Sequence, residues 1–304
     1  MTYSILVATM NRPQAIANLL DSMEKQTFLP QECILVDQSK DGRTKDVCDA
    51  YIKRMQGRGQ VFKYVRQETS SLVKARNRGV DESIGEIICF VDDDVILNQD
   101  YFERIAFYFK DPSIGGVTGN VFVETPLKGF KWQVRKLITK IFLLNSFDGR
   151  LTASTFGYPI YEREVTKVQE VDLFGGYSMN YRRELVLRHR PDEWFSGYGF
   201  REDVDLSYRI SRDTKMIIVP DAKFLHDVST INRLDFGALK KMQFKNHLYL
   251  FKKFRKYGAA TWILFWYSLS GIIVLDFLEY LAGFKKHKWS TFAANFSAIG
   301  QMWD

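Results

Sequence analysis

The amino-acid sequence predicts an α/β protein with a mostly parallel sheet covered by helices on both faces. Over the first 125 residues, short apolar runs rich in β-branched residues alternate with longer segments whose apolar residues recur at helical spacing. This strand–helix order is typical of parallel sheets, because parallel neighbours need a crossover connection. The composition, 46% hydrophobic and 26% charged, is that of a packed globular protein.

The expected elements follow one another in a regular order. We expect strands at 4–10, 33–39, 62–67 and 86–95, and helices at 13–25, 44–55 and 72–84. Pro13 is suited to a first helical position, where its fixed φ fits and its missing N–H leaves no hydrogen bond unmade.

Polar side chains stand where three of the apolar runs end: Thr9, Asn11, Arg12, Asp37, Asp92, Asp93 and Asp94. Ligands of parallel α/β sheets bind beyond the carboxyl ends of the strands, so we expect these side chains to lie together. Ordinary turn and capping roles would explain Asn11 or Asp37 alone, but they explain three consecutive aspartates poorly.

The run Asp92-Asp93-Asp94 places three carboxylates close together, where their repulsion is costly unless a cation compensates it. Such oxygen ligands suit Mg²⁺ or Mn²⁺ held partly by substrate phosphates, and a solvated turn is the alternative. No Walker A or G-x-G-x-x-G sequence follows the first apolar run. The main support for an ATPase or a Rossmann dehydrogenase is therefore missing.

Seven motifs in the range 3–256 together resemble the family 2 glycosyltransferases of the GT-A fold. In chain order they are TMNRP, ILVDQSKDG, KARNRG, CFVDDDV, GGYSMNYRREL, GYGFREDVDLSYRI and KFLHDVS. The resemblance implies a Rossmann-like sheet and an inverting enzyme that moves a sugar from a nucleoside diphosphate to a hydroxyl acceptor.

The resemblance also implies that the nucleotide-activated sugar binds across the first half of the chain. Asp37 can accept hydrogen bonds from a base or a ribose, and cationic side chains can pair with phosphate, although Lys74 alone would also pass for a surface charge. The implied donor-binding residues are Thr9, Asn11, Arg12, Asp37, Lys74, Arg76, Asp92, Asp93, Gly175 and Gly176.

Asp92 and Asp94 match the two acidic ends of the family's D-x-D motif, which holds a divalent metal against the donor diphosphate, and Asp94 is the implied direct ligand. His226 matches a late residue that ligates the metal or contacts the diphosphate, whereas a structural role is the alternative for an isolated histidine. The implied cofactor, Mn²⁺ or Mg²⁺, neutralises charge that develops on the departing diphosphate.

A second acidic cluster, Glu202, Asp203 and Asp205, opens a helix-like run that ends near Arg212. Simple capping is one interpretation, because the helix dipole favours acids in a first turn. By the resemblance, Glu202-Asp203 is the catalytic acidic pair and Asp203 the base. An inverting transferase needs such a carboxylate within hydrogen-bond reach of the acceptor hydroxyl.

Gly175-Gly176 would let the backbone approach a ligand closely, and a bulge or tight turn is the alternative. In the family this segment borders the donor sugar and the acceptor, but Tyr177 stands where Asn is more usual. Three aromatic residues before the acidic pair are candidates for stacking on an acceptor sugar or for ordinary packing: Trp194, Tyr198 and Phe200.

The charge is divided along the chain. The net charge is +7, and the first 230 residues hold 32 basic and 32 acidic side chains, whereas the last 74 hold 11 and 4. We expect a catalytic domain at 1–230, with a nucleotide-sugar half at 1–125 and an acceptor half at 126–230, and a basic helical region at 231–304. The neutral body argues against nucleic-acid binding, despite a pI near 9.1.

An uncharged run at 257–275 would extend about 28 Å as a helix, close to the roughly 30 Å of a bilayer core. Trp262, Trp266 and Tyr267 stand near its middle, where a span would not place interfacial aromatics. An interfacial or re-entrant helix, a span and a soluble packing helix stay open. With the basic segments 128–147 and 285–288, the run is consistent with a glycan or lipid-linked acceptor at an anionic membrane surface.

Three cysteines without C-x-x-C spacing, and no apolar leader after Met1, favour a cytoplasmic location, here at the inner face of the cell membrane. The Q-x-x-R-W motif of processive synthases is absent, so we expect single additions in cell-surface polysaccharide or glycolipid assembly, with a UDP-sugar as the favoured donor. The alternative is a catalytically inactive transferase-like scaffold at a membrane surface, against which the complete acidic motifs argue.

Overall fold

The computed structural model describes residues 1–55, 57–122, 129–227, 231, 235–255, 258–281 and 289–303. The chain divides into two compact units. Unit 1 comprises Met1–Thr125 and Tyr161–Arg233, and unit 2 comprises Pro126–Ile160 and Leu234–Asp304.

The first half of unit 1 is a parallel sheet. Its strands are β1 (Tyr3–Thr9), β2 (Glu32–Asp37), β3 (Val61–Arg66) and β4 (Ile87–Val91), ordered β3-β2-β1-β4. The register sets Leu6 beside Ile34 on one side and Phe90 on the other. Strands β1, β2 and β4 are buried on both faces, which explains why they are continuous apolar runs in the sequence.

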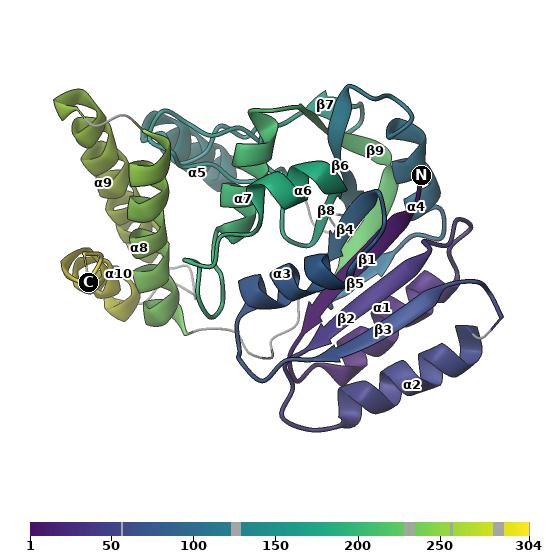
Figure 1. The fold of residues 1–304 in the computed structure, drawn as a ribbon. Coiled ribbons are helices and arrows are strands. Elements are labelled where there is room, and N and C mark those ends of the chain that lie inside the picture. Colours follow the sequence, from purple (N-terminus) through teal and green to yellow (C-terminus); the bar gives the residue numbers. More distant parts are fainter. Residues whose placement is uncertain are drawn as a thin grey trace. The chain divides into compact units, whose positions relative to one another are not determined.

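Helices cover both faces of this half (Figure 1). Ile5 and Val7 of β1 pack in one core with α1 (Pro13–Glu24), α2 (Arg43–Met55) and α4 (Tyr101–Tyr108). Leu6 faces the other way, toward Gly79 of α3 (Leu72–Glu82). The expected α/β class and the order of the first elements are confirmed.

Beyond β4 the sheet is mixed. β8 (Ser178–Arg182) runs antiparallel to β4 and to β6 (Ile114–Val121), and β9 (Lys215–His226) runs parallel to β6. β5 (Val95–Leu97) and β7 (Gln169–Glu170) pair antiparallel with β9. The helices of this half are α6 (Arg183–His189) and α7 (Glu202–Ser211).

Unit 2 is helical in its described residues. Its helices are α5 (Phe130–Ile141), α8 (Phe236–Phe254), α9 (Ala259–Leu281) and α10 (Trp289–Gly300). His247 is buried and stacks between Phe156 and Phe265, with ring centroids 3.5 and 5.2 Å away. Helix α9 is long and apolar enough to cross a membrane, but 33% of its most apolar window is buried, and one such helix is weak evidence for a span.

The structure groups residues 126–160 with the C-terminal helices, whereas the sequence suggested an acceptor half of the catalytic domain. Residues 126–160 belong there because α5 and the following Phe142 pack on α9. Arg135 pairs with Glu279 at 3.0 Å, the Tyr267 hydroxyl donates to the Ile141 carbonyl at 2.9 Å, and Phe142 lies against Gly271. The division of function between two halves stays a prediction, and the basic cluster 285–288 lies outside the described residues.

Gly119 in β6 provides a test of how tightly the sheet packs in unit 1. A Cβ there would lie 2.4 Å from the Ala222 carbonyl oxygen and 2.5 Å from the Tyr101 ring, both buried. We expect Gly119→Ala to lower the free energy of unfolding by about 1–3 kcal/mol through overpacking. Gly42→Ala, whose Cβ would meet nothing within 4 Å, is the control and should not destabilise. Urea denaturation measures both, and equal effects would contradict the tight fit at Gly119.

Candidate functional site

The ends of β1 and β4 are joined by a buried polar contact. Asp93 accepts a hydrogen bond from the Thr9 hydroxyl at 2.7 Å and pairs with the Arg12 guanidinium at 2.8 Å. Arg12 also lies 3.5 Å from Asp94 and donates to the Ile231 carbonyl. Burial raises the pKa of Asp93 to about 6, against the opposing effect of Arg12. Of the seven side chains expected to lie together at the strand ends, Thr9, Arg12, Asp93 and Asp94 thus do so.

Asn11 and Asp37 belong to a neighbouring arrangement around Ser39. Asp37 is buried and accepts hydrogen bonds from the Ser39 N–H at 2.8 Å and the Tyr64 hydroxyl at 2.7 Å. Asn11 adopts a left-handed φ of 56°, and its N–H donates to the Ser39 hydroxyl at 2.7 Å. These contacts shape the loop after β2, so Asp37 already serves the fold before any ligand is considered.

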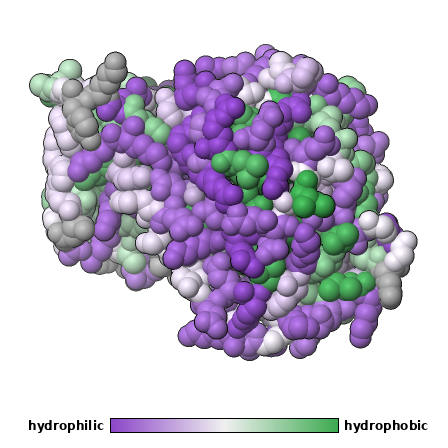
Figure 2. Space-filling model, viewed as in Figure 1, coloured by the Kyte–Doolittle hydropathy of each residue, from purple (hydrophilic) through white to green (hydrophobic). Residues whose placement is uncertain are grey.

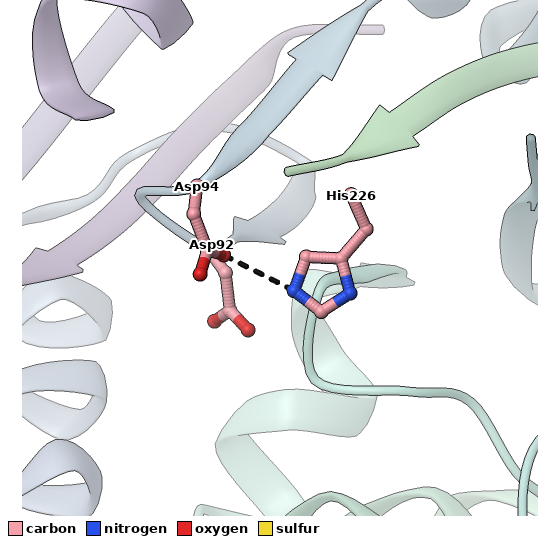
Figure 3. A group of neighbouring side chains, drawn as sticks. All are labelled: Asp92, Asp94 and His226. Atoms are coloured by element: carbon pink, nitrogen blue, oxygen red, sulfur yellow. Dashed lines mark hydrogen bonds and ion pairs between the residues drawn. The ribbon is translucent and has the colours of Figure 1, made fainter. Parts of the chain in front are cut away.

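Asp92, Asp94 and His226 form one group whose possible ligand atoms all lie within 4.8 Å of one another (Figure 3). The His226 Nε2 atom lies 3.1 Å from Asp94 Oδ1. Antiparallel pairing sets Val95 of β5 opposite His226 of β9, and the Asp227 N–H donates to the Asp94 carbonyl. The two carboxylates offer oxygen ligands that suit Mn²⁺ or Mg²⁺, and the imidazole adds a nitrogen ligand beside them.

Arg76 lies between the two acidic clusters. Its side chain is 4% exposed, and its guanidinium pairs with Asp92 at 3.0 Å and with Glu202 of α7. It also donates to the Gly176 carbonyl at 2.9 Å. Burial opposes the charge, but Glu202 and Asp92 more than compensate, so the net shift of the Arg76 pKa is upward. The guanidinium is thus already paired within the protein, and its expected contact with ribose or diphosphate stays a prediction.

Asp203 is held on the other side of the same segment. Its carboxylate accepts from the Gly176 N–H at 3.0 Å and from the Val204 N–H at 2.9 Å. Burial raises the pKa of Asp203 above the usual aspartate range. A Cβ on Gly176 would lie 3.0 Å from the Arg76 guanidinium, and one on Gly175 would meet the Tyr177 ring at 2.3 Å. Close packing thus leaves no room for a side chain at Gly175 and little room at Gly176.

Glu202 and Asp203 occupy different environments although they are neighbours. Glu202 is 3% exposed, while Asp203 is half-buried. Burial raises the pKa of Glu202 to about 7, opposed by Arg76 and reinforced by Asp203. The acidic group at the end of β4 and the acidic start of α7 thus share Arg76 and Gly176, although they are far apart in the chain.

Other predicted residues stand apart from this network. The Lys74 side chain is exposed, and its backbone N–H donates to the Ser71 hydroxyl that caps α3. Trp194 is exposed, and Tyr198 and Phe200 are half-buried in the segment before α7, so their stacking role stays a prediction.

Tyr177 is a residue whose place the sequence did not reveal. Its ring lies 5.3 Å from the His226 ring and 5.4 Å from the Phe224 ring, measured between centroids. Its carbonyl accepts from the Asp92 N–H at 3.3 Å. Tyr177 therefore supports two members of the Asp92–Asp94–His226 group. The only signal in the sequence was its departure from the more usual Asn.

The sheet and the acidic groups beyond its strand ends define a protein of the GT-A glycosyltransferase class. The Staphylococcus aureus TarS structure with UDP-GlcNAc aligns over 99% of this chain and 80% of that one, with a TM-score of 0.61 and 14% identity. A Pyrobaculum calidifontis mannosyltransferase in complex with GDP-Man and Mn²⁺ aligns over 99% and 87%, with a TM-score of 0.58 and 18% identity. At these identities the likeness shows the fold.

The chain belongs to glycosyl transferase family 2, whose model matches residues 4–183. The glycosyltransferase EpsH of Bacillus subtilis is 34% identical over 102 residues, which are 34% of this chain and 28% of that protein. The O-antigen chain rhamnosyltransferase RfbN of Salmonella typhimurium is 25% identical over 233 residues, covering 65% of this chain and 70% of RfbN. The match thus spans well under half of EpsH, the first of these relatives.

The raised pKa of Glu202 predicts how stability varies with pH. The pKa of about 7 in the folded state exceeds the usual glutamate value of about 4.3, so the folded state binds the proton more tightly. This contribution to stability is fully present below about pH 4.3 and is lost as the pH rises to about 7. We expect Glu202→Gln to flatten that decline.

Urea denaturation at a series of pH values from about 4 to about 8 measures how the free energy of unfolding changes with pH. Glu68→Gln, at an exposed position, is the control and should leave the slope unchanged. Parallel curves for wild type and Glu202→Gln would contradict the burial argument.

Proposed function

We propose that the protein is an inverting, metal-dependent glycosyltransferase that moves a single sugar from a nucleoside-diphosphate sugar to a hydroxyl acceptor. One observation carries this proposal: the group Asp92–Asp94–His226 and the carboxylate of Asp203 belong to one polar network through Arg76 and Gly176. A transferase needs a site for the leaving group and a base for the acceptor, and this network supplies candidates for both.

The metal site is proposed at Asp92, Asp94 and His226. The donor set fits, because carboxylates and an imidazole within 4.8 Å offer ligand atoms of the kind that Mn²⁺ binds. Bound there, the cation would supply Lewis-acid stabilisation of the departing diphosphate. Arg12, 3.5 Å from Asp94, adds positive charge beside the same carboxylate. The Pyrobaculum calidifontis mannosyltransferase binds Mn²⁺ together with GDP-Man, which supports a divalent metal here.

Asp203 is proposed as the catalytic base, with Glu202 as its supporting partner. Asp203 is half-buried, so the carboxylate remains reachable by an acceptor, and two backbone N–H groups orient it. Its raised pKa makes it a better proton acceptor than an ordinary aspartate. Arg76 holds Glu202 and Asp92 in place.

The donor is proposed to be a UDP-sugar that contacts the ends of β1, β2 and β4, helix α3 and the segment before β8. The candidate contacts are Thr9, Asn11, Arg12, Asp37, Lys74, Arg76, Asp92, Asp93, Gly175 and Gly176. The TarS structure holds UDP-GlcNAc, which supports a nucleotide-sugar donor without selecting the sugar. RfbN is named for O-antigen chains, which supports a role in cell-surface polysaccharide or glycolipid assembly. We place the enzyme at the inner face of the cell membrane.

Asp203→Asn tests the base. We expect the variant to lose about 10²–10⁴-fold in kcat while it keeps donor affinity, because the amide cannot accept the acceptor proton. For the wild type, activity should fall at acidic pH with a midpoint above the ordinary aspartate pKa of about 3.9. The exposed Asp49→Asn is the control. Normal turnover by Asp203→Asn would reject this role.

Two histidine–aspartate pairs allow a matched test of the metal site. His226 lies 3.1 Å from Asp94, and His189 lies 2.9 Å from Asp213 in the same unit but outside the site. We expect His226→Gln to lower the affinity for Mn²⁺ about 10–100-fold, and His189→Gln to leave it unchanged. The affinity is read from the Mn²⁺ concentration at which a UDP-, GDP- or dTDP-sugar stabilises the protein. Thermal denaturation with each donor, with and without Mn²⁺, measures this. A wild type that responds to no donor would favour the inactive scaffold.

A further inference from the structure

Helix α9 buries its two charged residues beside apolar ones and leaves a stripe of other apolar residues exposed. The helix contains two charged residues, Asp276 and Glu279, and both are buried. Asp276 pairs with Lys240 of α8 at 2.7 Å and accepts a hydrogen bond from Asn295 of α10 at 2.7 Å, while Glu279 pairs with Arg135 of α5. Six of its exposed residues recur every three or four positions: Ile263, Trp266, Ser270, Val274, Phe277 and Leu281. A helix on a water-soluble surface instead turns its charged side chains to the solvent.

Two further helices of unit 2 present apolar stripes at the same spacing. In α5 the exposed stripe consists of Phe130, Val134, Leu137 and Ile141. In α10, which has no charged residue, it consists of Trp289, Ala293, Phe296 and Gly300. White and green atoms of weakly polar and apolar residues gather over α9 and α10 at the left edge of the space-filling view (Figure 2).

Side-chain contacts connect these stripes through α9. The Tyr267 hydroxyl donates to the Ile141 carbonyl at 2.9 Å, which joins the stripes of α5 and α9. The Tyr280 ring lies 6.0 Å from the Trp289 ring, which joins α9 and α10. We call this surface, formed by the stripes of α5, α9 and α10, the apolar face of unit 2. Exposed apolar side chains gathered on neighbouring helices in this way mark an interaction site.

The charge of unit 2 indicates which partner fits the face. The sequence of unit 2 holds 16 basic and 5 acidic residues, whereas that of unit 1 holds 27 basic and 31 acidic residues. Exposed lysines flank the stripe of α5 at Lys131 and Lys140. A second copy of the chain would bring two such basic borders together, which is unfavourable. Anionic lipid headgroups would pair with them while the acyl chains accept the apolar side chains.

We propose that unit 2 docks in the interface of an anionic membrane through this apolar face, with α9 lying in the membrane plane. The proposal rests on the membrane location given under Proposed function and specifies how it is achieved. A span would expose all sides of α9 to lipid, whereas its buried side is committed to ion pairs with Lys240 and Arg135. Trp266 near the middle of α9 is placed as expected for a helix that lies at the headgroup level.

Tryptophan fluorescence tests the proposal on the unmodified full chain. Five of the six tryptophans belong to unit 2, and Trp266 and Trp289 lie on the apolar face. We expect vesicles that contain phosphatidylglycerol and brominated acyl chains to quench the fluorescence. Vesicles of brominated phosphatidylcholine alone should quench it far less. Alkaline carbonate should release the bound protein. No quenching, or resistance to carbonate extraction, would overturn docking in the membrane plane.

A matched pair of double variants tests the surface itself. We expect Ile263→Gln with Phe277→Gln to weaken vesicle partitioning at least about tenfold, since both side chains would leave the lipid. Ile84→Gln with Phe107→Gln, at positions of unit 1 that are at least as exposed, should partition as the wild type does. Equal partitioning of both variants, or a wild-type dimer that only the first variant loses, would overturn the proposal.

The donor experiment separates this inference from the proposed function. Both double variants should keep the Mn²⁺-dependent stabilisation by the donor sugar, because none of the four residues belongs to the catalytic site. A wild type that binds vesicles but no donor would reject the glycosyltransferase mechanism and leave the docking surface in place. A wild type that binds donor but no anionic vesicle would reject only the docking surface.

Discussion

One buried cation, Arg76, holds together the two acidic clusters on which the candidate site depends. Asp92 and Glu202 both lie against it, and Asp203 shares the Gly176 peptide with it. Three carboxylates around one peptide would otherwise repel one another. Removing one member of such a buried arrangement typically costs about 3–5 kcal/mol, since it leaves the remaining charges uncompensated. Arg76 therefore constrains the fold and the site together.

The same constraint accounts for the local sequence around the site. Gly176 has no side chain because a Cβ would press on the Arg76 guanidinium, and Gly175 has none because Tyr177 folds back over it. Tyr177 in turn packs against His226 and bonds the backbone of Asp92. A motif that first suggested close approach to a sugar is thus already explained by close approach of the protein to itself. The two explanations are compatible, because a tightly packed segment is also a rigid one.

Much of the fold was predictable because its first half is governed by local rules. Strands buried on both faces are continuous apolar runs, and the helices between them follow the helical period. The predicted and observed boundaries of β1, α1 and α3 therefore differ by at most two residues. The meeting of Asp94 with His226 was not predictable from periodicity, since it depends on the register of β5 with β9. The position of Arg76 is equally non-local, because only the tertiary structure brings α3 to α7.

The tail shows the limit of composition as a guide. An uncharged run of residues suggested a choice among three helix environments, and charge counted along the chain placed a boundary near residue 230. Contacts instead join α5 to α9 and bury Asp276 and Glu279, so the helix with the most apolar sequence holds two ion pairs on its inner side. Taking paired charges out of water costs free energy, and apolar side chains that stay exposed to water do not offset that cost. The arrangement becomes favourable where the outer side meets lipid, because the ion pairs then stay inside and the apolar side chains leave water.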